Sequence, residues 1–346
     1  MIRIDEYLLN KSTLNPSIKL KGKHVKQNIK TQKHTVAYTV KATNETLAKI
    51  IKDEFEKQSG IVNLNHIDVS DVTDFHNVFY EKENYEFDVS EWDTSKATNM
   101  SSMFYGCSKF NCDISRWDVS HVTNMGNMFA RCASFNKDIN AWDVSNVMTM
   151  SRMFLKCEKF NKPLDDWDVS NVIEMTAMFY DCNTFNQDIS MWDVSNVKDM
   201  SQMFSGCSSF NQDLNSWDVS KVEDTDEMFM GCVNFNSFFD EWDTSNIVSM
   251  SRMFMGCEKF EGNGLSGWDV SKVYDMNSMF NKCKMLDANL NNWDVSNVEY
   301  MSRTFQGCAS LRWPFSNWNV SKVRAHRDTF DGCAKLEEGD LPKFRT

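Results

Sequence analysis

The sequence has no long apolar run and lacks the short motifs that commonly mark enzymes. No segment approaches the roughly 18 apolar residues of a membrane span, and the first twenty residues hold no apolar stretch long enough for a signal peptide or lipoprotein anchor. GxSxG, a Walker loop, HExxH and GxGxxG are all absent, and the six histidines are scattered. These absences predict a non-enzymatic protein that does not span a membrane and needs no cofactor.

Cysteine is plentiful, but no CxxC pair of the zinc-binding kind occurs among the 11 cysteines. Ten of them keep a regular spacing, which predicts a column of buried thiols packed as small hydrophobic side chains rather than disulfides or a metal array. Cys112 is off this column and is predicted to be exposed. Many reduced thiols favour a reducing compartment such as a cytoplasm or a virion. The regularly spaced cysteines are Cys107, Cys132, Cys157, Cys182, Cys207, Cys232, Cys257, Cys283, Cys308 and Cys333.

Tryptophan follows the same fixed period, and we call these residues the ladder tryptophans. The step is 25 residues, with one extra residue before the eighth member. Self-similarity at a constant period is typical of a solenoid, in which each coil packs only on its neighbours. The ladder tryptophans are Trp92, Trp117, Trp142, Trp167, Trp192, Trp217, Trp242, Trp268, Trp293 and Trp318.

Each repeat mixes two hydrophobic periods. The consensus is W-D-V-S-N/K-V-x-x-M-S-x-M-F-x-G-C-x-x-F-N-x-D-I/L-x-x, and its Trp-Asp-Val start alternates as a short strand does. Within 125–132 the Met, Met, Phe and Cys side chains fall at i, i+3, i+4 and i+7, one stripe of a helix. The sequence therefore predicts an α/β repeat solenoid with a parallel sheet on one face and short helices on the other.

Three regions are predicted. Residues 1–60 hold a basic segment and a small α+β cap, with a strand over 34–41 and a helix over 44–58 that begins at Asn44. Residues 61–336 form about eleven coils, and 337–346 form a short polar tail. Residues 1–60 carry 12 Lys/Arg and 6 Asp/Glu, so the remaining chain has a net charge of −12 − 6 = −18. An acidic solenoid repels phosphates, which argues against nucleic-acid binding along its length.

The repeat resembles that of the BspA-type leucine-rich-repeat surface proteins. The closest unit is MSQMFSGCSSFNQDL at 200–214, and the likeness extends over about 61–336. The resemblance implies a leucine-rich-repeat-like, right-handed stack of coils at a cell surface, with a role in adhesion or host interaction and no catalytic residues. It favours a surface location, whereas the free cysteines favour the cytoplasm or a virion.

A column of acidic residues follows the ladder tryptophans, from Asp68 through Asp294 to Asn319. Neighbouring carboxylates about 4.8 Å apart repel by roughly 0.9 kcal/mol even in water. We expect each carboxylate to be compensated by hydrogen bonds from the Ser two residues later, and not by a row of cations. An asparagine column at Asn111, Asn136 and onward is expected to satisfy backbone groups, and most of the 22 methionines are expected to pack in the core.

Candidate partner-binding residues lie where the repeat departs from its consensus, because a uniform polar face offers no anchor. These residues are Phe238, Phe239, Trp313 and Phe315. Phe239 and Trp313 are predicted to be the exposed anchors, and Phe238 and Phe315 to fill core positions. The assignment within the Phe238–Phe239 pair depends on register, which the extra residue near 262–264 disturbs.

The function predicted from the sequence is protein–protein interaction or adhesion by a non-enzymatic repeat protein. The alternative is a structural component of a viral particle or surface layer, in which the solenoid packs on copies of itself. A carbohydrate-binding module is a weaker alternative. A protein partner of unknown identity is expected.

Overall fold

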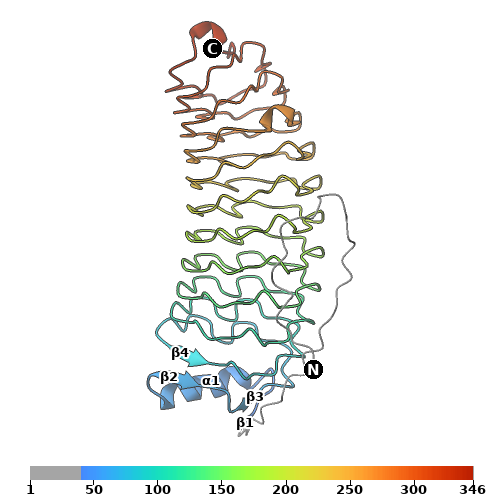
Figure 1. Cartoon of the computed structure of the whole chain (residues 1–346), viewed down its shortest axis with the longest axis vertical. Helices are drawn as coiled ribbons and strands as arrows, with labels where there is room; N and C mark the ends of the chain where they lie inside the picture. Colours follow the sequence, from blue (N-terminus) through green and yellow to red (C-terminus); the bar gives the residue numbers. More distant parts are fainter. Residues whose placement is uncertain (1–39, 346) are drawn as a thin grey trace, which may run out of the picture. The chain divides into compact units, whose positions relative to one another are not determined.

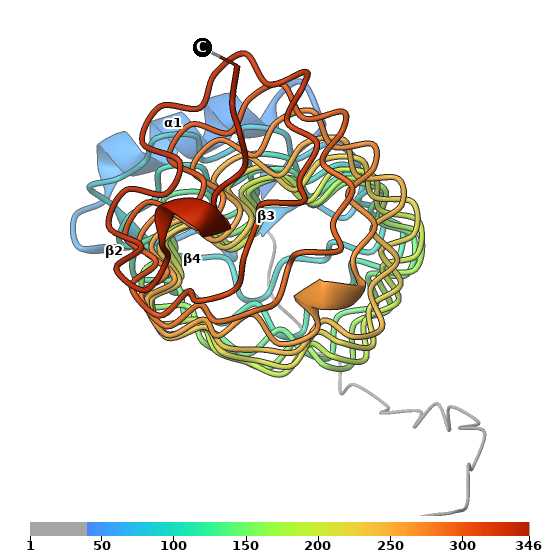
Figure 2. The ribbon, with the colours of Figure 1, turned by 90° about the horizontal axis from the view of Figure 1, so that it is seen from above.

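The computed structural model describes residues 40–345, which belong to one compact unit. The predicted basic segment 1–33 and most of the predicted strand 34–41 lie outside the described residues. The described chain winds into stacked coils of similar outline, which superimpose in the view along the stack (Figures 1 and 2). Within this part of the chain no helix is long and apolar enough to cross a bilayer.

A small α+β cap begins the stack. Strand β1 (Val40–Lys41) pairs in parallel with β3 (Ile67–Asp68), and β2 (Ile61–Asn63) pairs in parallel with β4 (Glu86–Asp88). Helix α1 (Leu47–Lys57) lies between β1 and β2 in the chain and buries Leu47, Ile51 and Phe55, because these side chains recur at helical spacing.

The predicted helix start at Asn44 is wrong, because α1 begins three residues later. The Asn44 amide is used elsewhere: its Oδ1 accepts the backbone N–H of Thr73 at 3.0 Å, and its Nδ2 donates to the Thr73 hydroxyl at 3.0 Å. These bonds tie the cap to the first coil.

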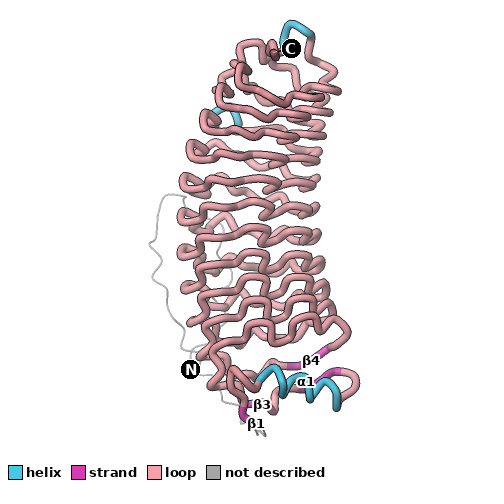
Figure 3. Tube along the Cα trace, turned by 180° about the vertical axis from the view of Figure 1, so that it is seen from behind, coloured by secondary structure: helices cyan, strands magenta, loops and turns pink. Residues whose placement is uncertain are grey.

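Apart from α1 in the cap, the described residues contain no α-helix (Figure 3). The prediction of short helices on one face of the coils was therefore wrong. In the coil that starts at Trp117, the N–H groups of Met128, Ala130 and Cys132 donate to carbonyls three residues back, at 2.9–3.1 Å. Asn127 and Arg131 have φ of 58° and 63°, the left-handed conformation found at the third residue of a type II turn. Consecutive turns therefore replace the helix.

Alternate N–H groups of the same segment bond to the next coil. Met125, Asn127, Phe129 and Arg131 donate to carbonyls of residues 149–155 at 2.6–3.1 Å. Successive coils are also joined by one isolated parallel β-bridge each. The first bridge pairs Asp74 with Asn99, and the last pairs Tyr300 with Ala325. The parallel stacking was predicted, but its hydrogen bonds run through the turn segment instead of the Trp-Asp-Val segment.

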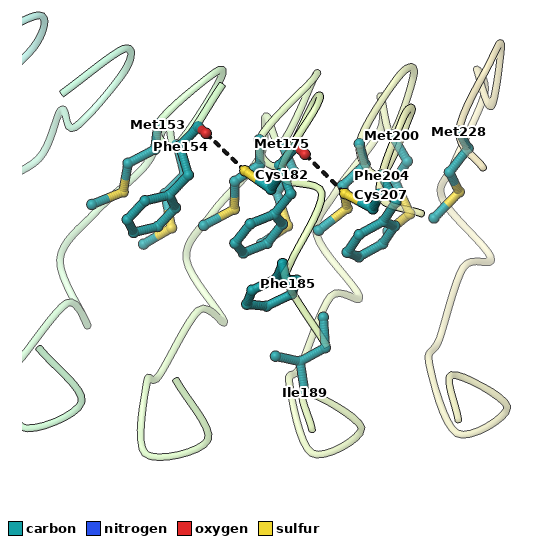
Figure 4. Packing of buried hydrophobic residues seen from close by; sticks show 14 of the residues in the cluster. Met153, Phe154, Met175, Cys182, Phe185, Ile189, Met200, Phe204, Cys207 and Met228 are labelled. Carbon is teal, nitrogen blue, oxygen red and sulfur yellow. Dashed lines mark hydrogen bonds between the residues drawn. The ribbon is translucent and has the colours of Figure 1, made fainter. Parts of the chain in front are cut away.

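The core is a set of side-chain columns along the stack. The Met, Phe and Cys residues of segment 125–132 are buried, and Phe129 stacks on the equivalent Phe154 with ring centroids 5.6 Å apart. Figure 4 shows the same columns further along the stack, for example Phe154 and Phe204. Each ladder indole donates its Nε1–H to a carbonyl 28 or 29 residues earlier in the chain, as Trp192 does to Leu164 at 2.9 Å. Each coil thus supplies packing surface and hydrogen-bond partners to its neighbours, which is the expected source of stability in a solenoid.

The single extra residue of the repeat is absorbed locally. Residues 262–264 lead into a short 3₁₀ turn, η1 (Leu265–Gly267), whose Leu265 restores the buried Ile/Leu position. Gly264 has φ of 89°, and a Cβ there would lie 2.6 Å from the carbonyl carbon of Phe239. Only glycine fits this approach without displacing backbone.

The last coil is covered in part by the tail. A 3₁₀ turn, η2 (Glu338–Asp340), follows the final cysteine, and the Asp340 carbonyl accepts the N–H of Phe315 at 2.6 Å. Phe344 stacks on His326 with ring centroids 4.2 Å apart.

Candidate partner-binding surface

The Phe238–Phe239 pair is oriented opposite to the prediction. Phe239 is fully buried in the Ile/Leu position and contacts Trp242 and Trp268 edge to face, at 4.6 and 5.5 Å between centroids. Phe238 is 51% exposed. The physical reason is register: the inserted residue lies one coil later, at 262–264, so 238–239 keep the regular alternation. Phe238, not Phe239, is the exposed aromatic side chain.

Trp313 and Phe315 come closer to the prediction. Phe315 is fully buried and contacts Trp318 edge to face at 4.8 Å. Trp313 is half-buried instead of freely exposed, because its Nε1 donates to the Asp287 carbonyl at 3.0 Å and the Arg312 guanidinium lies 5.5 Å from its ring centre. Arg312 is in turn held by an ion pair with Asp287 at 3.0 Å. The indole is therefore preorganised, with part of its surface open.

The exposed and half-exposed residues among these define what we call the return-loop surface: Phe238, Arg312 and Trp313. Phe238 follows its ladder tryptophan by 21 residues and Trp313 by 20, three coils further on. With strands spaced about 4.8 Å apart, the two aromatic side chains are roughly 14 Å apart along the stack. Phe238 and Trp313 thus hold adjacent positions of the repeat, and in the coil that starts at Trp268 the same two positions carry the exposed Asn289 and the half-buried Ala288.

The acidic column is compensated locally, as predicted. Asp118 Oδ1 accepts the N–H of Ser120 at 3.0 Å and its hydroxyl at 2.6 Å. The same turn recurs in the other coils, and at Asp218 the bonds from Ser220 lower the pKa of the carboxyl. Within residues 40–345, no three His, Cys, Asp or Glu side chains are grouped so as to hold a metal ion.

We expect calcium to leave the stability of the protein unchanged, because the carboxylates of the column already have local donors. The melting temperature in millimolar-range calcium and in excess chelator should agree within error. A rise of many degrees with calcium would contradict the hydrogen-bonding account and indicate a row of cations.

The regularly spaced cysteines form the predicted buried column of free thiols. Each Sγ donates to a Phe carbonyl of the preceding coil, as Cys182 does to Phe154 at 2.8 Å (Figure 4). Burial raises the pKa of Cys107 and of Cys333 to about 12. The off-column Cys112 is half-buried, contrary to the prediction, because its Sγ lies 3.4 Å from Asp88 Oδ1. Burial is the main reason why the pKa of the Cys112 thiol rises to about 12, and the nearby Asp88 carboxylate also raises it.

A thiol reagent is therefore expected to react slowly with the native protein, at Cys112 and at the end-coil Cys333 before any other position, since a thiolate is the reactive form. Labelling followed by mass spectrometry, with and without denaturant, measures this. Rapid modification of five or more cysteines in the native state would refute the buried column.

The asparagine column also behaves as predicted. Asn136 Oδ1, for example, accepts the N–H of Asn161 in the next coil at 3.1 Å. This chain of amide bonds continues between coils and satisfies backbone groups at the start of each return loop.

Sequence reasoning missed a second surface, a groove of about 600 Å³ on the turn segments of the coils that start at Trp217 to Trp293. Its walls carry Arg252, Lys282 and Arg303, and Met230 and Met255 contribute apolar surface. The signal was available: these three basic residues occupy two positions of the repeat, 10 and 14 residues after the ladder tryptophan, in an otherwise acidic stack.

The geometry places the described chain in a definite class, a repeat solenoid built on columns of buried cysteine and aromatic side chains. Three overlapping stretches, 49–164, 136–240 and 232–344, match the family described as "Mycoplasma protein of unknown function, DUF285". Together they extend over most of the sequence, and the chain belongs to this DUF285 family.

Other comparisons add little. No curated protein matches the chain. A solved structure titled "Crystal structure of TLR13-ssRNA13 complex" is similar at 12% identity and a TM-score of 0.24, over 86% of this chain and 44% of that one. The chain thus spans less than half the length of that protein.

Proposed function

We propose that this protein is a non-enzymatic binding protein that holds another protein against its return-loop surface. The observation that carries the proposal is the 51% exposure of Phe238 at a position occupied by aspartate in the two preceding coils, Asp188 and Asp213. Exposing a large aromatic ring costs hydration free energy that burial against a partner recovers. Aromatic and arginine side chains are also the residues most often dominant in protein interfaces.

The neighbourhood of Trp313 supports the same function. Its indole is fixed by the Asp287 carbonyl and by Arg312, so little side-chain entropy remains to be lost on binding.

The resemblance to BspA-type surface proteins leads us to place this binding at a cell surface, as adhesion or host interaction. In the alternative role, as a structural component, the return-loop surface would contact a second copy of the chain. The partner identity separates the two: copies of the chain itself indicate a structural layer, and a different protein indicates a binder.

The test begins with capture of partners by the intact chain and their identification by mass spectrometry. The affinity of the leading partner is then measured for the wild type, Phe238→Ser, Trp313→Ala and the double variant. Each single change should weaken binding by at least about 1 kcal/mol, as expected for an anchor residue.

Met191→Ser is the matched control, because Met191 is 83% exposed but lies on a different coil outside the return-loop surface. It should leave the affinity unchanged. Unchanged affinity in the Phe238/Trp313 double variant would move the site elsewhere and end the proposal.

A further inference from the structure

The groove on the turn segments differs in charge from the rest of the stack. Arg252, Lys282 and Arg303 line it against one acidic residue, Glu227, so its lining carries a net charge of 3 − 1 = +2. Residues 61–346 as a whole carry −18. A positive strip on an acidic stack attracts a negatively charged segment and repels positively charged ones.

The basic side chains of the groove keep unused hydrogen-bond donors. Arg252 pairs with Glu227 through one terminal nitrogen at 2.7 Å, and Arg303 pairs with Asp328 through Nε at 3.5 Å. Their side chains remain 53% and 49% exposed. A guanidinium has five N–H donors, so each arginine can also bind a second carboxylate. Lys282 makes no ion pair with any residue of 40–345.

A chain of amide hydrogen bonds ends inside this groove. Asp331 Oδ2 accepts from Gln306 Nε2 at 3.0 Å, and Gln306 Oε1 accepts from Asn281 Nδ2 at 2.9 Å. This order fixes the orientation of both amides and leaves Asn281 Oδ1 as the last acceptor. Asn281 is 4% exposed and its Oδ1 has no partner among the described residues.

In the preceding coil, Met255 occupies the repeat position equivalent to Asn281. The Met255 side chain has no N–H or O–H donor for Asn281 Oδ1. A buried acceptor without a donor costs about 1–3 kcal/mol in a folded protein. A ligand that brings a donor to Asn281 Oδ1 would remove that cost. The unbranched, half-exposed Met255 side chain can move to admit it.

We propose that this groove binds an extended acidic segment of another protein. Its carboxylates pair with Arg252, Lys282 and Arg303, a main-chain N–H donates to Asn281 Oδ1, and an apolar side chain packs on Met230 and Met255. A small inorganic anion would use the charges but leave the methionines and the amide acceptor unoccupied. A peptide uses all of them.

The spacing of the arginines favours a particular backbone. Arg252 and Arg303 occupy equivalent positions two coils apart, which is about 9.6 Å at a strand spacing of about 4.8 Å. A polyproline II helix advances about 9.3 Å in three residues and returns to the same side. An acidic residue at every third position of such a segment therefore matches the row of basic side chains.

The test uses a fluorescein-labelled peptide that repeats Glu-Pro-Leu, which presents glutamate along one edge and leucine along another. Fluorescence anisotropy with the full chain measures its affinity, and the same peptide with Gln for Glu is the neutral probe. We expect the acidic probe to bind at least roughly tenfold more tightly than the neutral one, with the difference shrinking as salt is raised.

Variants then locate the site. Lys282→Gly is mild because glycine holds this position in the adjacent coils, at Gly256 and Gly307, and because Lys282 already has φ of 66°. It should weaken the acidic probe several-fold, and Arg252→Gln/Lys282→Gly/Arg303→Gln should abolish the preference for Glu over Gln. The matched controls are Arg152→Gln and Lys156→Gly, at the same two repeat positions outside the groove, and they should change affinity less than about twofold.

Two outcomes would overturn the proposal: equal binding of the acidic and neutral probes by the wild type, or an equal loss of affinity in the groove and control variants. The Phe238→Ser/Trp313→Ala variant should bind the acidic probe as the wild type does. The two surfaces can thus fail separately, and loss of either leaves the other testable.

Discussion

Replacing Trp192 by alanine is expected to lower the free energy of unfolding by about 3–5 kcal/mol, the usual loss for a buried large aromatic side chain. The indole is 3% exposed and lies between Trp167 and Trp217, with ring centroids 6.4 and 6.5 Å away. Its Nε1–H bond to the Leu164 carbonyl is lost as well, which leaves a buried acceptor unsatisfied. Urea unfolding followed by far-ultraviolet circular dichroism measures the change.

Trp313→Ala is the matched control for this prediction, because the side chain is the same and only its position in the repeat differs. Trp313 is half-buried and off the ladder, so its removal should cost only about 1 kcal/mol. Equal losses at Trp192 and Trp313 would show that the ladder tryptophans do not form the core.

Phe239→Ala is expected to lower the free energy of unfolding by about 3–5 kcal/mol, and Phe238→Ala by less than about 1 kcal/mol. Phe239 is fully buried among Trp242, Trp268 and Phe254, whereas half of Phe238 is exposed. The two residues are adjacent and identical in type, so each is the control for the other. A larger loss at Phe238 would mean that this coil is shifted by one residue.

The periodic features of the fold could be predicted from the sequence because each recurs in many coils. The buried columns of Trp, Met, Phe and Cys, the local hydrogen bonds of the Asp column and the asparagine chain all have the expected places. A solenoid core depends on which repeat positions face inward, and a constant apolar position shows this directly.

The prediction of helices in the coils was wrong because a helix and a series of turns bury the same four side chains. Residues at i, i+3, i+4 and i+7 line one face of a helix, but successive turns with left-handed residues at Asn127 and Arg131 bury the same set. Glycine holds the second of these positions in six coils, Gly106 among them, and glycine is common where a helix ends. It is also the residue that a left-handed turn position favours.

The candidate site was predicted only in part, because it lies where the period breaks. The sequence identified Phe238, Phe239, Trp313 and Phe315 as departures, but one inserted residue left the register of 238–239 open. The structure shows that the extra residue near 262–264 leaves the alternation at 238–239 undisturbed, with Phe239 buried and Phe238 exposed. The groove was missed because Arg252, Lys282 and Arg303 are far apart in sequence and become neighbours only through stacking.

The central structural claim is that each coil is built from turns whose alternate N–H groups bond to the next coil. Backbone chemical shifts of the isotope-labelled protein over residues 125–132 test it most directly. The predicted result is positive φ at Asn127 and Arg131, with slow amide exchange at both because their N–H groups donate to Ser151 and Leu155. Uniformly negative, helical φ values throughout 125–132 would contradict it.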